Sequence, residues 1–287
     1  MKKQFLSILL LLLSISLGFA QKMVDSKQIP INGFFSNPVV SPDGQFALLT
    51  GEHYHGVFLL NLSSNEVKEI SNAEGSGYGY SWDSDSSKFY FKQKEKNEFN
   101  NDAKVYSFTL KNEKLSVVEN IKNNYLPSFS GMDTKKQKNV IVYTNLNTLK
   151  IEATDLVTKE KWEVTKDEGQ FYNAILSNDG SKIAVHNGSS IYIYDIKGTG
   201  IGKKIGTGLV TSWSKDDRYL IGFLDESSDG HSVTNSELYL FDTVSNKEIK
   251  LTSTENNFEM FPYLYDKNKI IYADDKSGHL FISNLKF

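Results

Sequence analysis

The sequence predicts an all-β fold made of six repeated four-stranded units. The turn Val40-Ser41-Pro42-Asp43-Gly44 returns in variant form until the chain ends, and a short run rich in β-branched and aromatic residues follows each copy. No helical periodicity is sustained for three turns in residues 21–287. Six copies in that span give about 44 residues a unit, which is the length of a four-stranded propeller blade. We therefore expect a six-bladed β-propeller of antiparallel blades.

The residue types of the repeated turn have a physical explanation. Pro42 presets φ, Asp43 hydrogen-bonds its own backbone, and Gly44 tolerates positive φ. The equivalent aspartates resemble metal ligands, but each lies on a separate blade, so we interpret them as turn residues. These aspartates are Asp43, Asp85, Asp133, Asp179 and Asp216. A large apolar residue precedes each turn and is expected between blades: Val40, Trp82, Phe129, Leu176, Trp213 and Leu264.

Each predicted blade begins just before its turn, near residues 37, 79, 125, 172, 210 and 260. The second strands are expected at Phe46 to Leu49, Phe89 to Phe91, Val140 to Tyr143, Ile183 to Val185, Tyr219 to Phe223 and Ile270 to Tyr272. The third strands are expected at Gly56 to Asn61, Lys104 to Leu110, Leu149 to Asp155, Ser190 to Ile196, Glu237 to Phe241 and His279 to Phe287. The fourth strands are expected at Glu66 to Ile70, Lys114 to Val118, Glu160 to Thr165, Lys203 to Ile205 and Lys247 to Leu251.

The sixth unit has only three strands in its own part of the sequence. Asp25 to Ile31 precedes the first turn as a fourth strand precedes a later one, with Ile29 and Ile31 alternating as a strand requires. We expect this segment to complete blade six and to close the ring, which removes an exposed sheet edge.

Residues 1–20 have the pattern of a secretory signal peptide. Lys2 and Lys3 precede an apolar run from Phe5 to Leu17, and Gly18-Phe19-Ala20 supplies small residues before Gln21. The run is shorter than the ~20 residues of a membrane span, and the chain has no cysteine for lipid or disulfides. We expect residues 21–287 to form a propeller that is periplasmic or secreted and soluble after cleavage, without a membrane span.

The charge balance disfavours nucleic acid as a partner. The formal net charge is −3, and it becomes more negative once Lys2 and Lys3 are removed. Arg218 is the only arginine, so the bidentate forks that read phosphate and guanine are nearly absent. The expected partners are a protein, a peptide or a polysaccharide of the cell envelope.

Two further patterns accompany the turn. The first is the longer turn unit Asn37-Pro38-Val39-Val40-Ser41-Pro42-Asp43-Gly44. The second is a third strand that ends in aspartate, as in Ile191-Tyr192-Ile193-Tyr194-Asp195 and Leu238-Tyr239-Leu240-Phe241-Asp242. Together they resemble the TolB-like propeller repeat across essentially all of residues 21–287. The resemblance implies a six-bladed fold. It leaves function open, because this repeat occurs in envelope proteins that bind partners, beside serine peptidases and in some polysaccharide lyases. The sequence contains no hydrolase domain, so peptidase activity is not expected.

Strand direction predicts which face carries function. In a four-stranded antiparallel blade, the loop before strand one and the loop joining strands two and three emerge on the same side. That side carries the two longest loops, Lys92 to Ala103 and Asp225 to Ser236. The predicted binding residues there are Tyr78, Tyr80, Tyr125, Phe171, Tyr172, His231 and Phe258, with Met260, His53, Tyr54, His55 and Phe99 nearby. Aromatic surfaces with polar tips suit peptides or sugars; alternatively, Tyr80 and Tyr172 fill the channel.

The same face suggests one metal site. The His53-x-His55 pair lies beside Glu52, and His231 in blade five could complete a ligand set for a divalent metal. The alternative is that these are solvated loop histidines. No Gly-x-Ser-x-Gly elbow is present. The sequence therefore favours an exported, non-catalytic binding or scaffold propeller without a cofactor. The alternative function is a metal-assisted carbohydrate lyase or hydrolase at the channel mouth.

Overall fold

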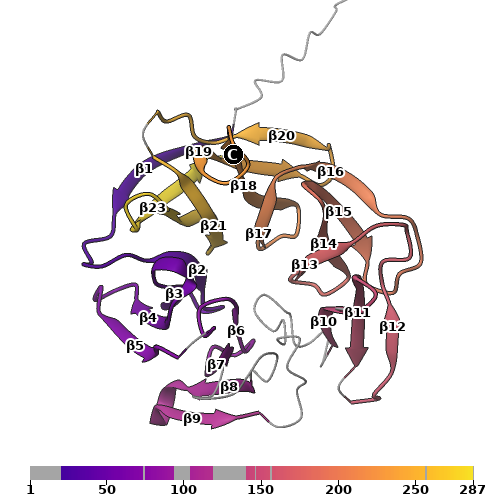
Figure 1. Cartoon of the computed structure of the whole chain (residues 1–287), viewed down its shortest axis with the longest axis horizontal. Helices are drawn as coiled ribbons and strands as arrows, with labels where there is room; N and C mark the ends of the chain where they lie inside the picture. Colours follow the sequence, from indigo (N-terminus) through magenta and orange to yellow (C-terminus); the bar gives the residue numbers. More distant parts are fainter. Residues whose placement is uncertain are drawn as a thin grey trace, which may run out of the picture.

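The computed structural model describes residues 21–73, 75–93, 104–118, 140–145, 147–155, 157–255 and 257–286. Six antiparallel sheets lie in a ring, as the propeller prediction requires (Figure 1). Five sheets have four strands, and the third blade has three strands within the described ranges. Its predicted first strand, starting near Tyr125, lies outside them. No helix in the described part of the chain is long and apolar enough to cross a bilayer.

The first three blades contain the following elements. Blade one has β2 (Ser36–Val40), β3 (Phe46–Thr50), the 3-10 helix η1 (Glu52–Tyr54), β4 (Val57–Asn61) and β5 (Val67–Ser71). Blade two has β6 (Tyr80–Trp82), β7 (Lys88–Gln93), β8 (Lys104–Thr109), the 3-10 helix η2 (Leu110–Asn112) and β9 (Lys114–Val117). Blade three has β10 (Val140–Asn145), β11 (Lys150–Asp155) and β12 (Lys161–Glu163).

The last three blades are built in the same order. Blade four has β13 (Phe171–Leu176), β14 (Lys182–Asn187), β15 (Ser190–Asp195) and β16 (Lys203–Thr207). Blade five has β17 (Leu209–Trp213), β18 (Tyr219–Ser227), β19 (Val233–Asp242) and β20 (Lys247–Lys250). Blade six has β21 (Glu259–Tyr265), β22 (Lys269–Asp274), β23 (His279–Lys286) and β1 (Lys22–Gln28).

Strands are arranged from the centre outwards in sequence order, except in blade six. Figure 1 shows β2, β6, β13, β17 and β21 nearest the centre. In blade six the outer strand is β1, which runs antiparallel to β23, with Lys22 opposite Lys286 and Gln28 opposite Phe281. The strand lies slightly before the predicted segment 25–31, and Ile29 extends the contact by donating its N–H to Leu280 O at 2.8 Å. That this strand holds the ring closed stays a prediction.

The apolar core lies between the blades. Each cluster in the described residues joins two neighbouring blades: Leu48 with Trp82, Ile151 with Ile183, and Ala184 with Leu220 are buried in such clusters. Two further clusters join blade five to blade six and blade six to blade one. Flat blades bury both faces this way, which explains why their inner strands are so rich in apolar residues.

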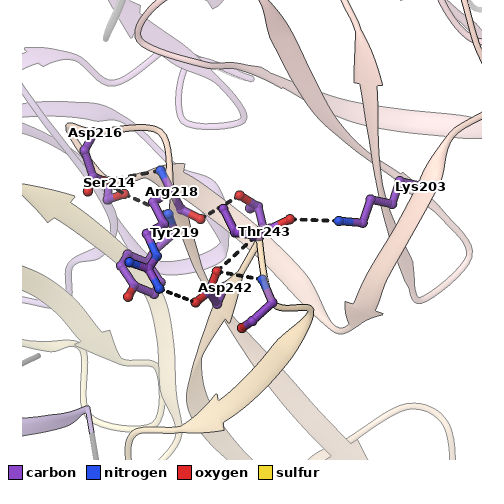
Figure 2. Close-up of polar contacts among 9 residues, drawn as sticks. Lys203, Ser214, Asp216, Arg218, Tyr219, Asp242 and Thr243 are labelled. Atoms are coloured by element: carbon purple, nitrogen blue, oxygen red, sulfur yellow. Dashed lines mark hydrogen bonds and ion pairs between the residues drawn. The ribbon is translucent and has the colours of Figure 1, made fainter. Parts of the chain in front are cut away.

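The repeated turn is a hydrogen-bonded unit, as predicted. Ser214 Oγ donates to Asp216 Oδ1 at 2.6 Å and accepts the Tyr219 N–H at 2.9 Å (Figure 2). Asp43 and Asp179 accept from Ser41 and Ser177 at 2.6 and 2.8 Å in the same way. This confirms the turn interpretation for these aspartates. Asp133 lies outside the described residues.

The only arginine stabilises the turn of blade five. Arg218 pairs with Asp242 at 2.9 Å, and its guanidinium lies 4.9 Å from the centre of the Tyr219 ring (Figure 2). Its carbonyl accepts the Thr243 hydroxyl at 2.7 Å, and Lys203 of blade four donates to Thr243 O at 2.9 Å. Arg218 is therefore engaged in blade packing.

The predicted tryptophans connect blades as well as filling space. Trp82 and Trp213 are 0% and 5% exposed. Trp82 Nε1 donates to Val39 O of the preceding blade at 2.9 Å, and Trp213 Nε1 donates to Ile175 O at 3.0 Å. The register of β2 and β13 shifts just before these carbonyls, after the left-handed residues Asn37 (φ 48°) and Asn173 (φ 50°). Such bulges release carbonyls from the blade's own ladder.

One predicted loop is largely strand. The sequence predicts a long loop over Asp225 to Ser236, but β18 and β19 remain paired through Asp225 opposite Ser236 and Ser227 opposite Val233. The side chains of this extension are mostly polar and exposed, so the hydrophobic alternation that marks a strand is absent there. The other predicted loop, Lys92 to Ala103, begins with the end of β7, and residues 94–103 lie outside the described ranges.

Candidate binding site

A cavity of about 1200 Å³ lies at the centre of the ring. It is lined by the inner strands β2, β6, β13, β17 and β21, which run in the same direction because the blades share one topology. Residues near the starts of these strands therefore lie at one end of the channel, and the repeated turns lie at the other. We name the first end the aromatic mouth, formed by Tyr54, Tyr78, Tyr172 and Phe261. We name the second the acidic mouth, formed by Asp43, Asp179, Asp216, Asp217 and Asp266.

Three rings of the aromatic mouth contact one another. Tyr54 and Tyr78 are stacked, with centroids 5.5 Å apart and planes 22° apart. Phe261 meets Tyr54 edge-on at 6.3 Å and packs against Phe223 at 5.0 Å. Tyr78 is 73% exposed and Tyr54 is 40% exposed. The stacked pair therefore offers a wide aromatic surface at the opening, supported by the half-buried Phe261 and, behind it, the buried Phe223.

The loop after β3 and the loop before β6 position this pair. His53 and Tyr54 have positive φ values of 55° and 58°, which turn η1 back toward β4. The Gly51 N–H donates to His55 O at 3.0 Å and closes the turn. A Cβ atom at Gly77 would overlap Thr50 and the backbone of Tyr54. Glycine at this position thus allows the loop that carries Tyr78 to lie directly on Tyr54.

Burial and nearby carboxylates raise the pKa values of Tyr54 and Tyr172. The pKa of Tyr54 is raised by burial and then by the negative charge of Asp275, which Ser36 Oγ holds at 3.0 Å. The pKa of Tyr172 is raised by burial and then by Asp225. Two carboxylates thus contribute negative potential near these rings.

Tyr172 covers a buried histidine at the junction of blades four and five. Its ring lies 5.3 Å from that of His186, and its hydroxyl donates to Gly188 O at 2.8 Å. His186 is 0% exposed, and its Nε2 accepts the Val210 N–H of blade five at 3.0 Å. Asn173 Nδ2 donates to Val210 O at 3.1 Å. His186 must be neutral to accept this bond, and burial lowers its pKa to about 4.

The predicted binding residues fall into different environments. Tyr78, Tyr80 and Tyr172 line the cavity, and Tyr172 is 42% exposed. Tyr80 is only 7% exposed, and its hydroxyl donates to Asn37 O of blade one, so it supports the channel wall. Phe258 is half-buried beneath Lys276, whose Nζ lies 5.4 Å from the ring centre, and it does not line the cavity. Tyr125 lies outside the described residues.

Phe171 lies in the core, apart from the other predicted binding residues. The sequence groups it with the binding residues, but it is 2% exposed and packs edge-on against Tyr194 at 5.8 Å and Tyr192 at 6.5 Å. Neighbouring strand residues face opposite sides, so Phe171 enters the core between blades three and four, whereas Tyr172 lines the channel.

The predicted metal ligands are not brought together. His53 is almost fully exposed, and its Nε2 lies 3.8 Å from Glu52 Oε1. His231 lies in the exposed turn after β18, where Asp229 Oδ1 accepts its backbone N–H at 2.8 Å. Among the described residues, which include His55, no three His, Cys, Asp or Glu side chains are placed to hold a metal ion. Within the described ranges, His53, His55 and His231 are therefore not grouped as a ligand set.

The acidic mouth is built from the repeated turns. Asp43, Asp179 and Asp216 each use Oδ1 to hold their own turn. Asp217 reaches the neighbouring blade, where it accepts the N–H groups of Asn178 at 2.7 Å and Asp179 at 2.8 Å. Burial, and then the charge of Asp179, raise the pKa of Asp217. Lys215 is the one cation among the described residues that line the cavity.

Comparison with known proteins supports the fold. No family model matches the chain, and no curated protein is similar in sequence. Among solved structures, TolB from Acinetobacter baumannii is 20% identical with a TM-score of 0.58, over 77% of this chain and 55% of that one. The chain thus spans about half the length of that protein. A putative TolB from Agrobacterium tumefaciens is 14% identical with a TM-score of 0.58, over 93% of this chain and 99% of that one. An oligogalacturonate lyase in complex with manganese is 14% identical with a TM-score of 0.52, over 91% of this chain and 80% of that one.

Proposed function

We propose that this chain is an exported, non-catalytic propeller that binds a protein, peptide or envelope polymer at the aromatic mouth of its channel. The observation that carries the proposal is the stacked Tyr54–Tyr78 pair, which lies exposed above a cavity of about 1200 Å³. Exposed aromatic rings on a rigid scaffold provide large contact area at a low entropic cost, and they dominate many binding surfaces.

The rigidity of the mouth supports binding. Three of the four rings are fixed by contacts within the protein: Tyr54 by the Gly77 loop, Tyr172 by its bond to Gly188 O, and Phe261 by Phe223. A preorganised surface loses little conformational freedom when a ligand arrives. The likeness to TolB structures shows the fold and is compatible with this role.

The alternative function is a metal-assisted carbohydrate lyase or hydrolase. The structural neighbour described as an oligogalacturonate lyase in complex with manganese is the observation that favours it. The described residues of this chain do not fit such a metal, because no three ligands converge. We therefore place the binding role first and derive no catalytic step for this chain.

The binding proposal is tested by affinity capture from an envelope extract with the wild-type protein and with Tyr78→Ala. Tyr78 is 73% exposed, so its truncation leaves the fold intact. The affinity for the captured component should fall by about 1–3 kcal/mol. Matched controls are Asn65→Gly and Asn246→Gly in the outer turns, where φ is 59° and 57° and glycine is tolerated. An affinity that responds to the two controls and not to Tyr78 contradicts the proposed site.

The alternative is tested on the same protein. Elemental analysis of the purified chain, with an assay for unsaturated sugar products from oligogalacturonate, distinguishes the two functions. A stoichiometric transition metal together with lyase activity would replace binding as the main function. Activity that is absent at every added divalent metal supports the binding role.

A further inference from the structure

We propose that the ligand of the channel is a positively charged, extended peptide segment rich in lysine or arginine. This inference rests on the proposed function and specifies the chemistry of its ligand. It follows from the charge of the cavity, from the exposed rings of the aromatic mouth and from the size of the channel.

The cavity carries an excess of negative charge. Its described lining contains the five aspartates of the acidic mouth and a single cation, Lys215, and one of the five, Asp266, is paired with Lys269 at 3.2 Å. Hydrogen bonds within the turns orient Asp43, Asp179 and Asp216, but these bonds do not neutralise the charge. A concave surface with one sign of charge concentrates field lines and attracts ligands of the opposite sign.

The other end of the channel suits the same ligand. Elsewhere in the protein, cations lie over aromatic faces: Lys150 over Phe171 at 5.1 Å and Lys276 over Phe258 at 5.4 Å. Within the described ranges no lysine or arginine lies over Tyr54, Tyr78, Tyr172 or Phe261. Asp275 and Asp225 add negative potential beside Tyr54 and Tyr172. Neutral rings with nearby carboxylates attract ammonium and guanidinium groups.

The volume and the charge of the cavity favour an extended peptide over an acidic polysaccharide. A volume of about 1200 Å³ exceeds that of most small-molecule pockets, and it extends from one mouth to the other. An extended peptide can place side chains at both mouths. A polyuronate would bring carboxylates against five aspartates, and this like-charge arrangement is unfavourable.

The test uses two triple variants that change net charge equally. The channel variant is Asp43→Asn/Asp179→Asn/Asp216→Asn, in which each asparagine keeps the Oδ1 that holds its turn. The control variant is Asp155→Asn/Asp195→Asn/Asp229→Asn. These aspartates are outside the cavity lining and hold turns in the same manner, accepting N–H groups from Val157 at 2.7 Å, Lys197 at 2.8 Å and His231 at 2.8 Å. Thermal unfolding verifies that both variants are folded.

Fluorescence anisotropy then measures binding of a labelled oligolysine peptide, an oligoglutamate peptide and a neutral Gly-Ser peptide of equal length, with spermine and oligogalacturonate as competitors. We expect oligolysine to bind more tightly than the other peptides, to weaken with salt, and to lose about tenfold or more in affinity in the channel variant. The control variant should retain wild-type affinity.

Other outcomes overturn the inference in distinguishable ways. Equal loss in both triple variants indicates a non-specific charge effect, and competition by spermine at the affinity of oligolysine excludes a peptide requirement. A further outcome is that the neutral peptide or oligogalacturonate binds in a way that depends on Tyr78 and is unchanged in the channel variant. That result overturns the inference of a cationic ligand, while the proposed function still stands. If no ligand, including components captured from envelope extract, responds to Tyr78→Ala, the proposed function itself fails.

Discussion

At the scale of single residues, His186 couples one wall of the channel to pH. Its Nε2 accepts a backbone N–H from blade five, and only the neutral ring can do so. Burial lowers its pKa, whereas backbone hydrogen bonds to Asn173 and Tyr172 oppose the shift. Tyr172 of the aromatic mouth lies on this ring. The junction between blades four and five is thus sensitive to a single proton.

We predict that His186 makes the protein less stable in acid. Its pKa is about 4 in the folded state against an ordinary value of 6.5, so the unfolded chain binds the additional proton between these values. The contribution is complete above pH 6.5 and is lost as pH falls toward 4, by about 3 kcal/mol in total. Urea unfolding across this range should show a shallower pH dependence for His186→Gln. His231→Gln, in an exposed turn, should behave as wild type; identical slopes for all three proteins would contradict the assignment.

We also predict that replacing Trp82 lowers the free energy of unfolding more than replacing Trp162, although both bond to a neighbouring blade. Trp82→Phe removes the bond to Val39 O and part of a fully buried ring, so the free energy of unfolding should fall by about 2–4 kcal/mol. Trp162→Phe also removes a bond, to Ile196 O at 2.7 Å, but Trp162 is only half-buried. Its cost should be about 1 kcal/mol. Chemical denaturation measures both, and equal costs would show that burial between blades is not the main effect.

At the scale of the element, the outermost strand of blade six is the most informative. β1 is largely polar and exposed, and Ile29, just after it, is 4% exposed in the cluster shared by blades six and one. The strand therefore contributes backbone pairing along its length and apolar burial at its end. These contributions can be separated by mutation.

We predict that Ile29→Asp lowers the free energy of unfolding by several kcal/mol, because it places a charge in an apolar cluster. Deleting residues 21–28 should lower it further and promote aggregation through the uncovered edge of β23. Lys27→Asp changes an exposed side chain of the same strand and should leave stability almost unchanged. Thermal unfolding and light scattering provide the measurements. A deletion variant that matches wild type in both would exclude a role of β1 in closing the ring.

Sequence could predict the strands because their turns follow a hydrogen-bonding rule that is local. Ser41 and Asp43, with their equivalents, satisfy that rule within a few residues. The aromatic mouth depends on distant contacts and on bulges. Phe261 was not predicted there, because its φ of 51° departs from regular strand geometry and changes the alternation of β21. Tyr54 was expected only around the site, since its stacking on Tyr78 requires the two loops to meet.

At the scale of the whole molecule, the ring combines a rigid wall with two chemically different ends. Successive blades are joined by tryptophan, serine and aspartate bonds to the neighbouring inner strand, such as Leu264 N–H to Ser212 Oγ at 2.8 Å. The sequence predicted this architecture from its period. It could not predict the charge separation along the channel, because the direction in which each turn carboxylate faces becomes evident only when all blades are assembled.

We predict that the exported protein begins at Gln21. The charged and apolar pattern of residues 1–20 favours cleavage after Ala20. Intact mass measurement of protein recovered from the cell envelope or medium should give the mass of residues 21–287. A control with Ala20→Asp should accumulate as the uncut chain, because an aspartate does not fit the small-residue position. Wild-type protein that keeps residues 1–20 would contradict export by this signal.

The pairing of Lys22 with Lys286 also sets the order in which the molecule can be completed. The strands of blades one, two, four and five follow one another along the chain, so each of these blades can form as soon as its own residues have been made. Blade six pairs β1 with β23, so this sheet is completed only after β23 has been made and a very large loop has closed. Until then β1 is unpaired and exposed to solvent. Its sequence, Lys-Met-Val-Asp-Ser-Lys-Gln, is mostly polar, which reduces its tendency to aggregate while it is unpaired.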